Sequence, residues 1–112
     1  MCVNSDFSSL IEESKALNSS LFSLIRLQLL TSIASVGQDG VTYRELKAAL
    51  NVTDGALYTN IKVLEENGYV KSKEITLEGK KLESYQITQE GLLAWEHTKN
   101  WLKKLIECGG KK

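Results

Sequence analysis

Metal-binding and crosslinking residues are scarce in this sequence. It has no proline, a single histidine (His97) and two cysteines, Cys2 and Cys108, at opposite ends of the 112 residues. Neither cysteine belongs to a Cys-x-x-Cys pair, so one chain lacks the ligands for a tetrahedral metal site. Two cysteines are also too few for a disulfide scaffold, which agrees with a reducing compartment.

Long apolar runs and the residue combinations of common catalytic sites are missing as well. The apolar runs are only a few residues long, too short to span a bilayer. The N-terminus has no basic stretch followed by an apolar one, so we expect a cytoplasmic protein. There is no glycine-rich phosphate loop and no Ser-His-Asp or paired-carboxylate arrangement. We therefore expect neither an enzyme nor a bound cofactor or metal.

Charge of one sign is not in excess. Fourteen basic residues balance fourteen acidic ones, giving a net charge of zero. This balance counts against a simple basic nucleic-acid binder, because lysine and arginine supply most of the non-specific affinity for phosphates. However, acidic residues outnumber basic ones in residues 1–20, and the reverse holds in residues 84–112. The local placement of the charges must therefore indicate the partner.

Hydrophobic periodicity predicts a single, mainly α domain with a small β-hairpin. Helix 21–36 carries only one charge, Arg26, and should form the centre of the core. A polar turn that includes Lys80 and Lys81 separates the two strands. The expected parts are an N-terminal helix (6–17), a central unit (20–88) with helices 21–36, 43–50 and 53–67 and strands 69–75 and 82–87, a closing helix (89–107) and a flexible tail (108–112).

Capping residues mark the two helices in the middle of the chain. Thr42 and Glu45 form the Thr-x-x-Glu capping box of helix 43–50. Thr53 can cap the next helix, and Gly68 stands where a left-handed residue would end it. The order helix, helix, tight turn, helix, hairpin, helix is the plan of a winged helix-turn-helix. In that plan the helix after the turn enters the DNA major groove.

The stretch NVTDGALYTNIKVLEENGYV, followed by EGKKLESYQITQEG, resembles winged helix-turn-helix DNA-binding regulators of the MarR and ArsR type, particularly a small single-domain subgroup. Arg26 also falls where these regulators often place an arginine. Tyr58, Asn60 (often histidine) and Leu82 depart from the pattern and bear on DNA sequence preference more than on the fold. The resemblance implies a homodimeric, sequence-specific transcriptional regulator of double-stranded DNA with a palindromic operator. The matching positions are Thr53, Gly55, Leu57, Ile61, Lys62, Leu64, Glu65, Gly68, Tyr69, Tyr85, Thr88 and Gly91.

Helix 53–67 has two distinct faces when residues are placed about 100° apart. Leu57, Ile61 and Leu64 cluster on one side, which must be buried. The opposite side combines a glycine for close approach, an aromatic hydroxyl, a second hydroxyl and a cation, which suits base edges and phosphates. A solvated helix face is the alternative interpretation. The residues of this opposite side are Gly55, Tyr58, Thr59 and Lys62.

Basic and polar residues outside this face complete the predicted DNA contacts. Lys80 and Lys81 sit at the predicted hairpin tip, with Lys71 on the first strand. Lysine is a point charge and should contact phosphate rather than bases. The interleaved glutamates leave open a soluble hairpin with scattered charge. The full predicted set is Tyr43, Arg44, Thr53, Gly55, Tyr58, Thr59, Lys62, Lys71, Lys80 and Lys81.

The closing helix is more apolar than a single domain requires. Its apolar residues, both tryptophans included, cover about half of the helical wheel. The excess predicts a partner helix, and by the resemblance this partner is a second copy of the chain. A monomer in which helices 6–17 and 89–107 cover each other is the alternative. The predicted interface residues are Phe7, Leu10, Trp95, Trp101, Leu102, Leu105 and Ile106.

Two further interpretations stay open at this point. Zero net charge favours a winged helix that serves as a protein-interaction module in a larger assembly, without intrinsic DNA specificity. Cys2 and Cys108 lie near the helices of the predicted dimer interface, where a redox or metal role competes with that of two ordinary terminal cysteines. No residue pattern identifies a small-molecule effector.

Overall fold

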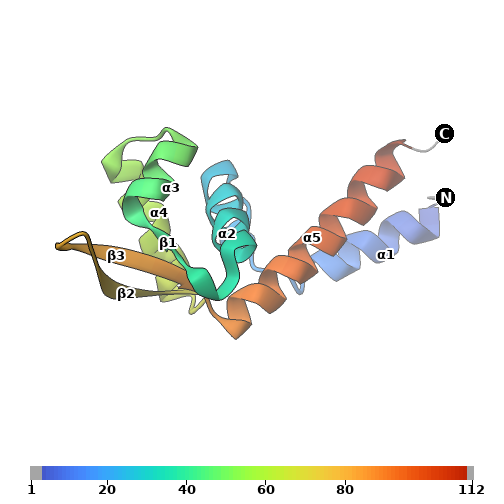
Figure 1. Cartoon of the computed structure of the whole chain (residues 1–112). Coiled ribbons are helices and arrows are strands. Elements are labelled where there is room, and N and C mark those ends of the chain that lie inside the picture. Colours follow the sequence, from blue (N-terminus) through green and yellow to red (C-terminus); the bar gives the residue numbers. More distant parts are fainter. Residues whose placement is uncertain (1–3, 111–112) are drawn as a thin grey trace.

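The chain, seen here in a computed structural model, is described for residues 4–110, with side chains from Phe7 onward (Figure 1). Its described part is mainly helical and has a small antiparallel sheet in the strand order β1-β3-β2, which confirms the predicted fold class. None of the described helices is long and apolar enough to cross a membrane. The elements are α1 (Asn4–Ser14), α2 (Leu24–Val36), β1 (Val41–Thr42), α3 (Tyr43–Leu50), α4 (Asp54–Glu66), β2 (Val70–Leu77), β3 (Lys80–Ile87) and α5 (Gln89–Gly110), with short 3-10 turns at Ser19–Leu21 and Gly37–Asp39.

The α2 helix lies at the centre of the core, as its apolar sequence predicts. Leu29, Leu30 and Ile33 on this helix are completely buried. They pack in one cluster with buried side chains of α3, α4, β2 and β3. Burying one such side chain contributes roughly 1.5–3 kcal/mol relative to leaving it exposed. This cluster therefore holds α4 firmly by one of its faces.

Both central helices begin at the predicted capping residues. The Thr42 hydroxyl accepts a hydrogen bond from the Glu45 amide at 3.2 Å, and the Glu45 carboxylate accepts one from the Thr42 amide at 2.9 Å. The Thr53 hydroxyl accepts from the Ala56 amide at 3.1 Å. After α4, Gly68 has a φ of 77°, the left-handed conformation expected there. The capping bonds thus fix where α4 begins and ends.

The hairpin turn is tighter than predicted. Only Glu78 and Gly79 form the turn, with φ angles of 52° and 78°, and the strands pair up to Leu77 and Lys80. Two-residue turns with positive φ at both positions match the right-handed twist of paired strands. Lys80 and Lys81 therefore belong to β3, and the prediction that placed both at the tip is corrected.

Helix ends also differ from the predicted ones. The first helix ends at Ser14 rather than at residue 17. The last continues through Gly110, so residues 108–110 of the predicted flexible tail are helical. Continuation of a packed helix is favourable because each added residue gains one backbone hydrogen bond. Cys2, Lys111 and Lys112 lie outside the described residues.

The α1 and α5 helices pack against each other and extend away from the remaining elements, and we call this pair the arm (Figure 1). The Trp101 indole Nε1 donates to the Leu10 carbonyl at 2.9 Å. Lys104 Nζ lies 3.2 Å from Glu13 Oε1. The arm accounts for the long dimension of the molecule, 58 Å against 25 and 21 Å.

Candidate nucleic-acid interface

The α4 helix presents a polar face away from the core, as its periodicity predicts. Leu57, Ile61 and Leu64 point inward and are at most 2% exposed. Gly55, Tyr58, Thr59 and Lys62 all lie on the exposed side. The Tyr58 side chain is 57% exposed although it is large and aromatic. We call these four exposed residues the reading face.

The side chains of the reading face keep their polar groups available. Lys62 Nζ lies 5.4 Å from the centroid of the Tyr58 ring and 3.6 Å from Glu65 Oε1. An exposed ion pair of this kind contributes little to stability, so the Lys62 ammonium group can leave Glu65 and bind a phosphate at little cost. A Cβ atom at Gly55 would meet no atom within 4 Å from the other described residues, apart from the adjacent backbone of its own helix. The face therefore combines open space with donors and acceptors suited to base edges and phosphates.

A polar cluster joins α3 to the start of α4. Lys47 Nζ lies 2.9 Å from Asp54 Oδ2, and the Tyr43 hydroxyl donates to the Asp54 backbone carbonyl at 3.2 Å. The hydrogen bond from Lys47 lowers the pKa of Asp54, whereas desolvation, followed by the Asp54 charge, raises the pKa of Tyr43. The hydroxyl of Tyr43 and the amine of Lys47 thus stabilise the turn between the two helices.

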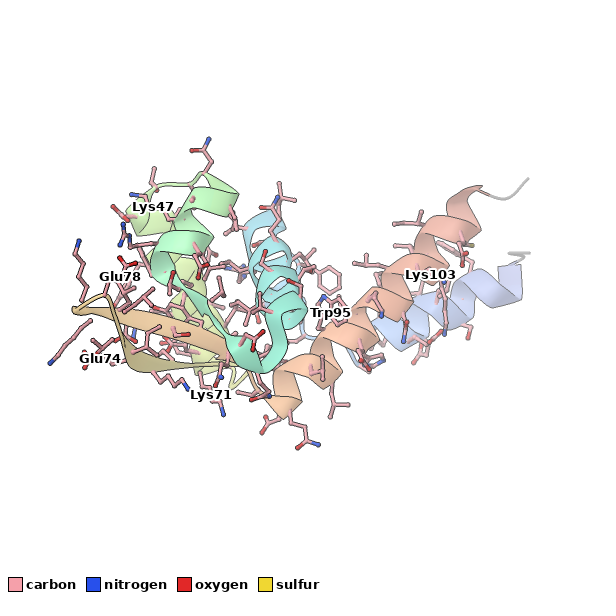
Figure 2. The ribbon with its side chains drawn as sticks, in the orientation of Figure 1. Lys47, Lys71, Glu74, Glu78, Trp95 and Lys103 are labelled. Carbon is pink, nitrogen blue, oxygen red and sulfur yellow. The ribbon has the colours of Figure 1, made fainter. Side chains whose placement is uncertain are left out.

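Arg44 and Thr53, two residues of the predicted DNA-contact set, flank this cluster, whereas one member of the cluster, Lys47, was not predicted. Arg44 and Thr53 are exposed beside it. The Thr53 hydroxyl caps α4, so its role is first of all positional. Lys47 (labelled in Figure 2) lies in the middle of α3, and its Nζ is within ion-pair distance of Asp54 at the start of α4. The sequence feature that could have identified Lys47 is Asp54, an acidic residue that follows it across a tight turn.

The lysines of the hairpin divide between its two faces. Pairing of Lys71 with Gln86 and of Leu77 with Lys80 places Lys71, Lys73 and Lys80 on one face. Lys81 lies on the opposite face, which also carries the buried Tyr85. Lys81 Nζ lies 4.0 Å from Glu74 Oε1. Glu74 belongs to β2, as does Lys71, and Figure 2 labels both. The four lysines therefore form no single patch.

Several residues of the predicted dimer interface have partners within the chain. Leu10 is 6% exposed and its carbonyl accepts the Trp101 indole N–H. The Trp95 indole donates to Thr31 Oγ1 at 3.0 Å, and its side chain lies between α5 and α2 (Figure 2). Leu102 and Leu105 are half-buried. By contrast, Leu92 and Leu93 near the start of α5 are exposed, and so are Phe7 (52%), Ile11 (45%) and Ile106 (70%) on the outer part of the arm; of the latter three, Ile11 was not predicted.

Comparisons with known proteins agree with this arrangement. Residues 25–106 match the family described as winged helix DNA-binding domain. An uncharacterized protein of Methanocaldococcus jannaschii is 34% identical over 92 residues, or 77% of this chain and 95% of that protein. The transcriptional regulator homologue protein from Pyrococcus horikoshii OT3 superposes with a TM-score of 0.75 at 24% identity, covering 89% of this chain and 95% of that one. MepR of S. aureus, solved in complex with DNA, superposes with a TM-score of 0.70 at 12% identity, covering 95% and 83%. These structures share the fold of this chain and confirm the winged helix.

Proposed function

This chain belongs to the winged helix DNA-binding domain family, and from that membership we propose that it is a sequence-specific transcriptional regulator that binds double-stranded DNA as a homodimer. The α4 helix would enter the major groove, and the β2–β3 hairpin would reach the adjacent minor groove or backbone. The observation that carries the proposal is the reading face, which is exposed while the opposite face of α4 is locked in the core. The similar fold of MepR, which was solved in complex with DNA, supports the proposed DNA binding.

Each polar group of the interface has a role that suits its chemistry. Tyr58 and Thr59 offer hydroxyl groups to base edges in the major groove. Lys62 and Arg44, which are both exposed cations, would contact phosphates. On the hairpin, Lys80 has no carboxylate within ion-pair distance among the described residues, whereas Lys81 is near Glu74. We therefore assign the stronger wing contact to Lys80.

Homodimerisation is proposed to use the part of the arm that remains exposed. The apolar side chains of Phe7, Ile11 and Ile106 there are exposed among the residues that the structure describes. A second copy related by a two-fold axis would cover them and place two α4 helices about one DNA turn apart. The expected operator is therefore a palindrome with two half-sites.

Selection of bound duplexes from a random pool tests the proposed function directly. We expect enrichment of one palindromic sequence, which reports binding, specificity and half-site symmetry together. The competing function is a protein-interaction module, which the zero net charge favours. If affinity for duplex DNA stays undetectable even at low salt, the regulator proposal fails and that module takes its place.

Replacing either Lys62 or Lys80 with alanine should weaken binding to all duplexes and reduce the slope of log affinity against log salt by about one unit for each phosphate that is no longer neutralised. The reason is that each neutralised phosphate releases condensed counterions. Fluorescence anisotropy at several salt concentrations measures the slope. Lys103→Ala is the matched control, because this lysine lies on the arm, far from the hairpin (Figure 2). An unchanged slope in the Lys62 and Lys80 variants would remove these residues from the interface.

Placing a charge in the proposed dimer interface should separate the two copies. We expect Ile106→Glu to sediment at the 12.5 kDa mass of one chain and the native protein to sediment at twice that mass. Burial of an unpaired carboxylate between two apolar arms is the physical cause. Leu77→Glu changes a similarly exposed leucine at the far end of the hairpin and should leave the dimer intact. A native protein that sediments as a single chain would end the homodimer proposal.

A further inference from the structure

The segment between α1 and α2 is hydrogen-bonded to the end of α4 and to the start of the hairpin. The side-chain amide of Asn18 donates to Asn67 Oδ1 and to the Tyr69 hydroxyl, both at 2.9 Å. Asn67 caps the end of α4 and donates in turn to the Val63 carbonyl at 2.8 Å. Asn18 therefore connects the arm side of the molecule to the last turn of α4.

A second branch leads from the same segment to the middle of α4. Arg26 Nε donates to the Ser20 carbonyl, and its Nη1 donates to Asn60 Oδ1 at 2.8 Å. Asn60 Nδ2 donates to the Ala56 carbonyl at 2.7 Å. The branch joins the first, because the Ser20 hydroxyl donates to Asn18 Oδ1 at 2.7 Å. We call Asn18, Ser20, Arg26, Asn60 and Asn67 the polar relay.

Directional bonds add a constraint that the apolar core does not supply. Burial of Leu57, Ile61 and Leu64 keeps α4 against α2, but apolar contact is non-directional and permits small rotations or shifts of the helix. The relay bonds have well-defined distances and lie in part-buried surroundings. A part-buried polar group that loses its partner is costly, so the relay favours one orientation of α4.

We propose that Asn18, Arg26 and Asn60 are positioning residues for DNA recognition, which hold α4 at a fixed angle to the arm. This inference rests on the proposed DNA-binding function and homodimer. The arm sets the separation of the two copies, whereas the relay sets the angle of each α4 relative to its arm. Together they match the two reading faces to the spacing of two half-sites.

The test compares Asn18→Ala and Asn60→Ala with the native full-length protein on three duplexes: the selected palindrome, a single half-site and a random sequence. We expect affinity for the palindrome to fall about tenfold or more, since only this duplex requires two correctly spaced α4 helices. Affinity for the half-site and the random duplex should stay within about twofold. Asn60→His, the residue common in similar regulators, keeps an acceptor for Arg26 and should restore most of the affinity. Gln28→Ala, at an exposed position of α2, is the matched control.

Amide hydrogen exchange gives a second readout that requires no DNA. In both alanine variants the amides of α4 should exchange faster, while those of α2 and of the β2–β3 hairpin keep their native rates. If affinity falls equally for all three duplexes, and in proportion to the fall in Tm, these residues have a merely structural role and the proposal is overturned. Unchanged affinities together with unchanged α4 exchange would overturn it as well. Failure of the native protein to bind any duplex refutes the proposed function instead, and the exchange rates then still decide whether the relay constrains α4.

Discussion

Replacing Gly91 with alanine should lower the free energy of unfolding by about 3 kcal/mol and the Tm by roughly 10 °C or more. Gly91 is buried in the first turn of α5, where that helix packs against Tyr69, the residue before β2. A Cβ atom at this position would lie 2.1 Å from the Tyr69 carbonyl oxygen and 2.8 Å from its carbonyl carbon. Such distances are far below van der Waals contact, so the backbone itself must move.

The backbone around Gly91 has little freedom to move. The Tyr69 carbonyl accepts a hydrogen bond from the Thr88 amide at 2.9 Å. The Thr88 hydroxyl donates to the Gly68 carbonyl at 2.6 Å and accepts from the Gly91 amide at 2.9 Å. Moving α5 away from Tyr69 would break several of these bonds together. This coupling makes the expected destabilisation larger than that of an ordinary surface substitution.

Thermal and urea unfolding of the two proteins measure the effect of Gly91→Ala. Gly109→Ala is the matched control, because Gly109 lies on the same helix and a Cβ there would meet no atom of the described residues within 4 Å. We expect this control to unfold at or slightly above the native Tm. A Gly91→Ala variant that unfolds within a few degrees of the native protein would show that α5 shifts freely, contrary to the bonds that Thr88 makes.

Most of the fold and the reading face could be predicted because local rules determine them. The 3.6-residue period of α4 separates Leu57, Ile61 and Leu64 from the exposed residues, whatever lies further away in the chain. The caps at Thr42 and Thr53 depend only on the three residues that follow each of them. Such features are set within one or two helical turns.

The remaining features depend on geometry that no local pattern contains. Because the hairpin turn contains only two residues, Lys80 and Lys81 are consecutive residues of β3. Neighbouring residues of a strand point to opposite faces, so the two lysines lie on different faces of the hairpin. The indole N–H groups of Trp95 and Trp101 have hydrogen-bond partners within the chain. The number of apolar residues on the closing helix therefore overestimates the apolar surface that is available to a second copy. Asn18 and Asn67 meet across 49 residues of sequence, and nothing in their neighbourhoods predicts this pairing.

Replacing Gly55 with alanine should change stability and DNA binding in opposite directions. Gly55 lies in the first turn of α4 and its φ is not positive. A Cβ there would meet no atom within 4 Å from the part of the chain that the structure describes, apart from the adjacent helix backbone. The fold therefore does not require glycine at this position. Alanine reduces the conformational entropy of the unfolded chain and should raise stability by about 0.4–1 kcal/mol. A glycine that costs stability, on an exposed face, points to a need for space outside the free protein.

If that space is filled by a DNA backbone or base edge, the added methyl group should lower the affinity for the selected palindrome about tenfold or more. Anisotropy titrations and thermal unfolding of the same preparations give both quantities. Gln28→Ala, at an exposed position of α2 outside the reading face and the arm, is the control for binding and should leave the affinity unchanged. If Gly55→Ala binds the palindrome as tightly as the native protein, the start of α4 does not approach DNA closely. The reading face would then have to be reassigned toward Tyr58 and Lys62, further along the helix.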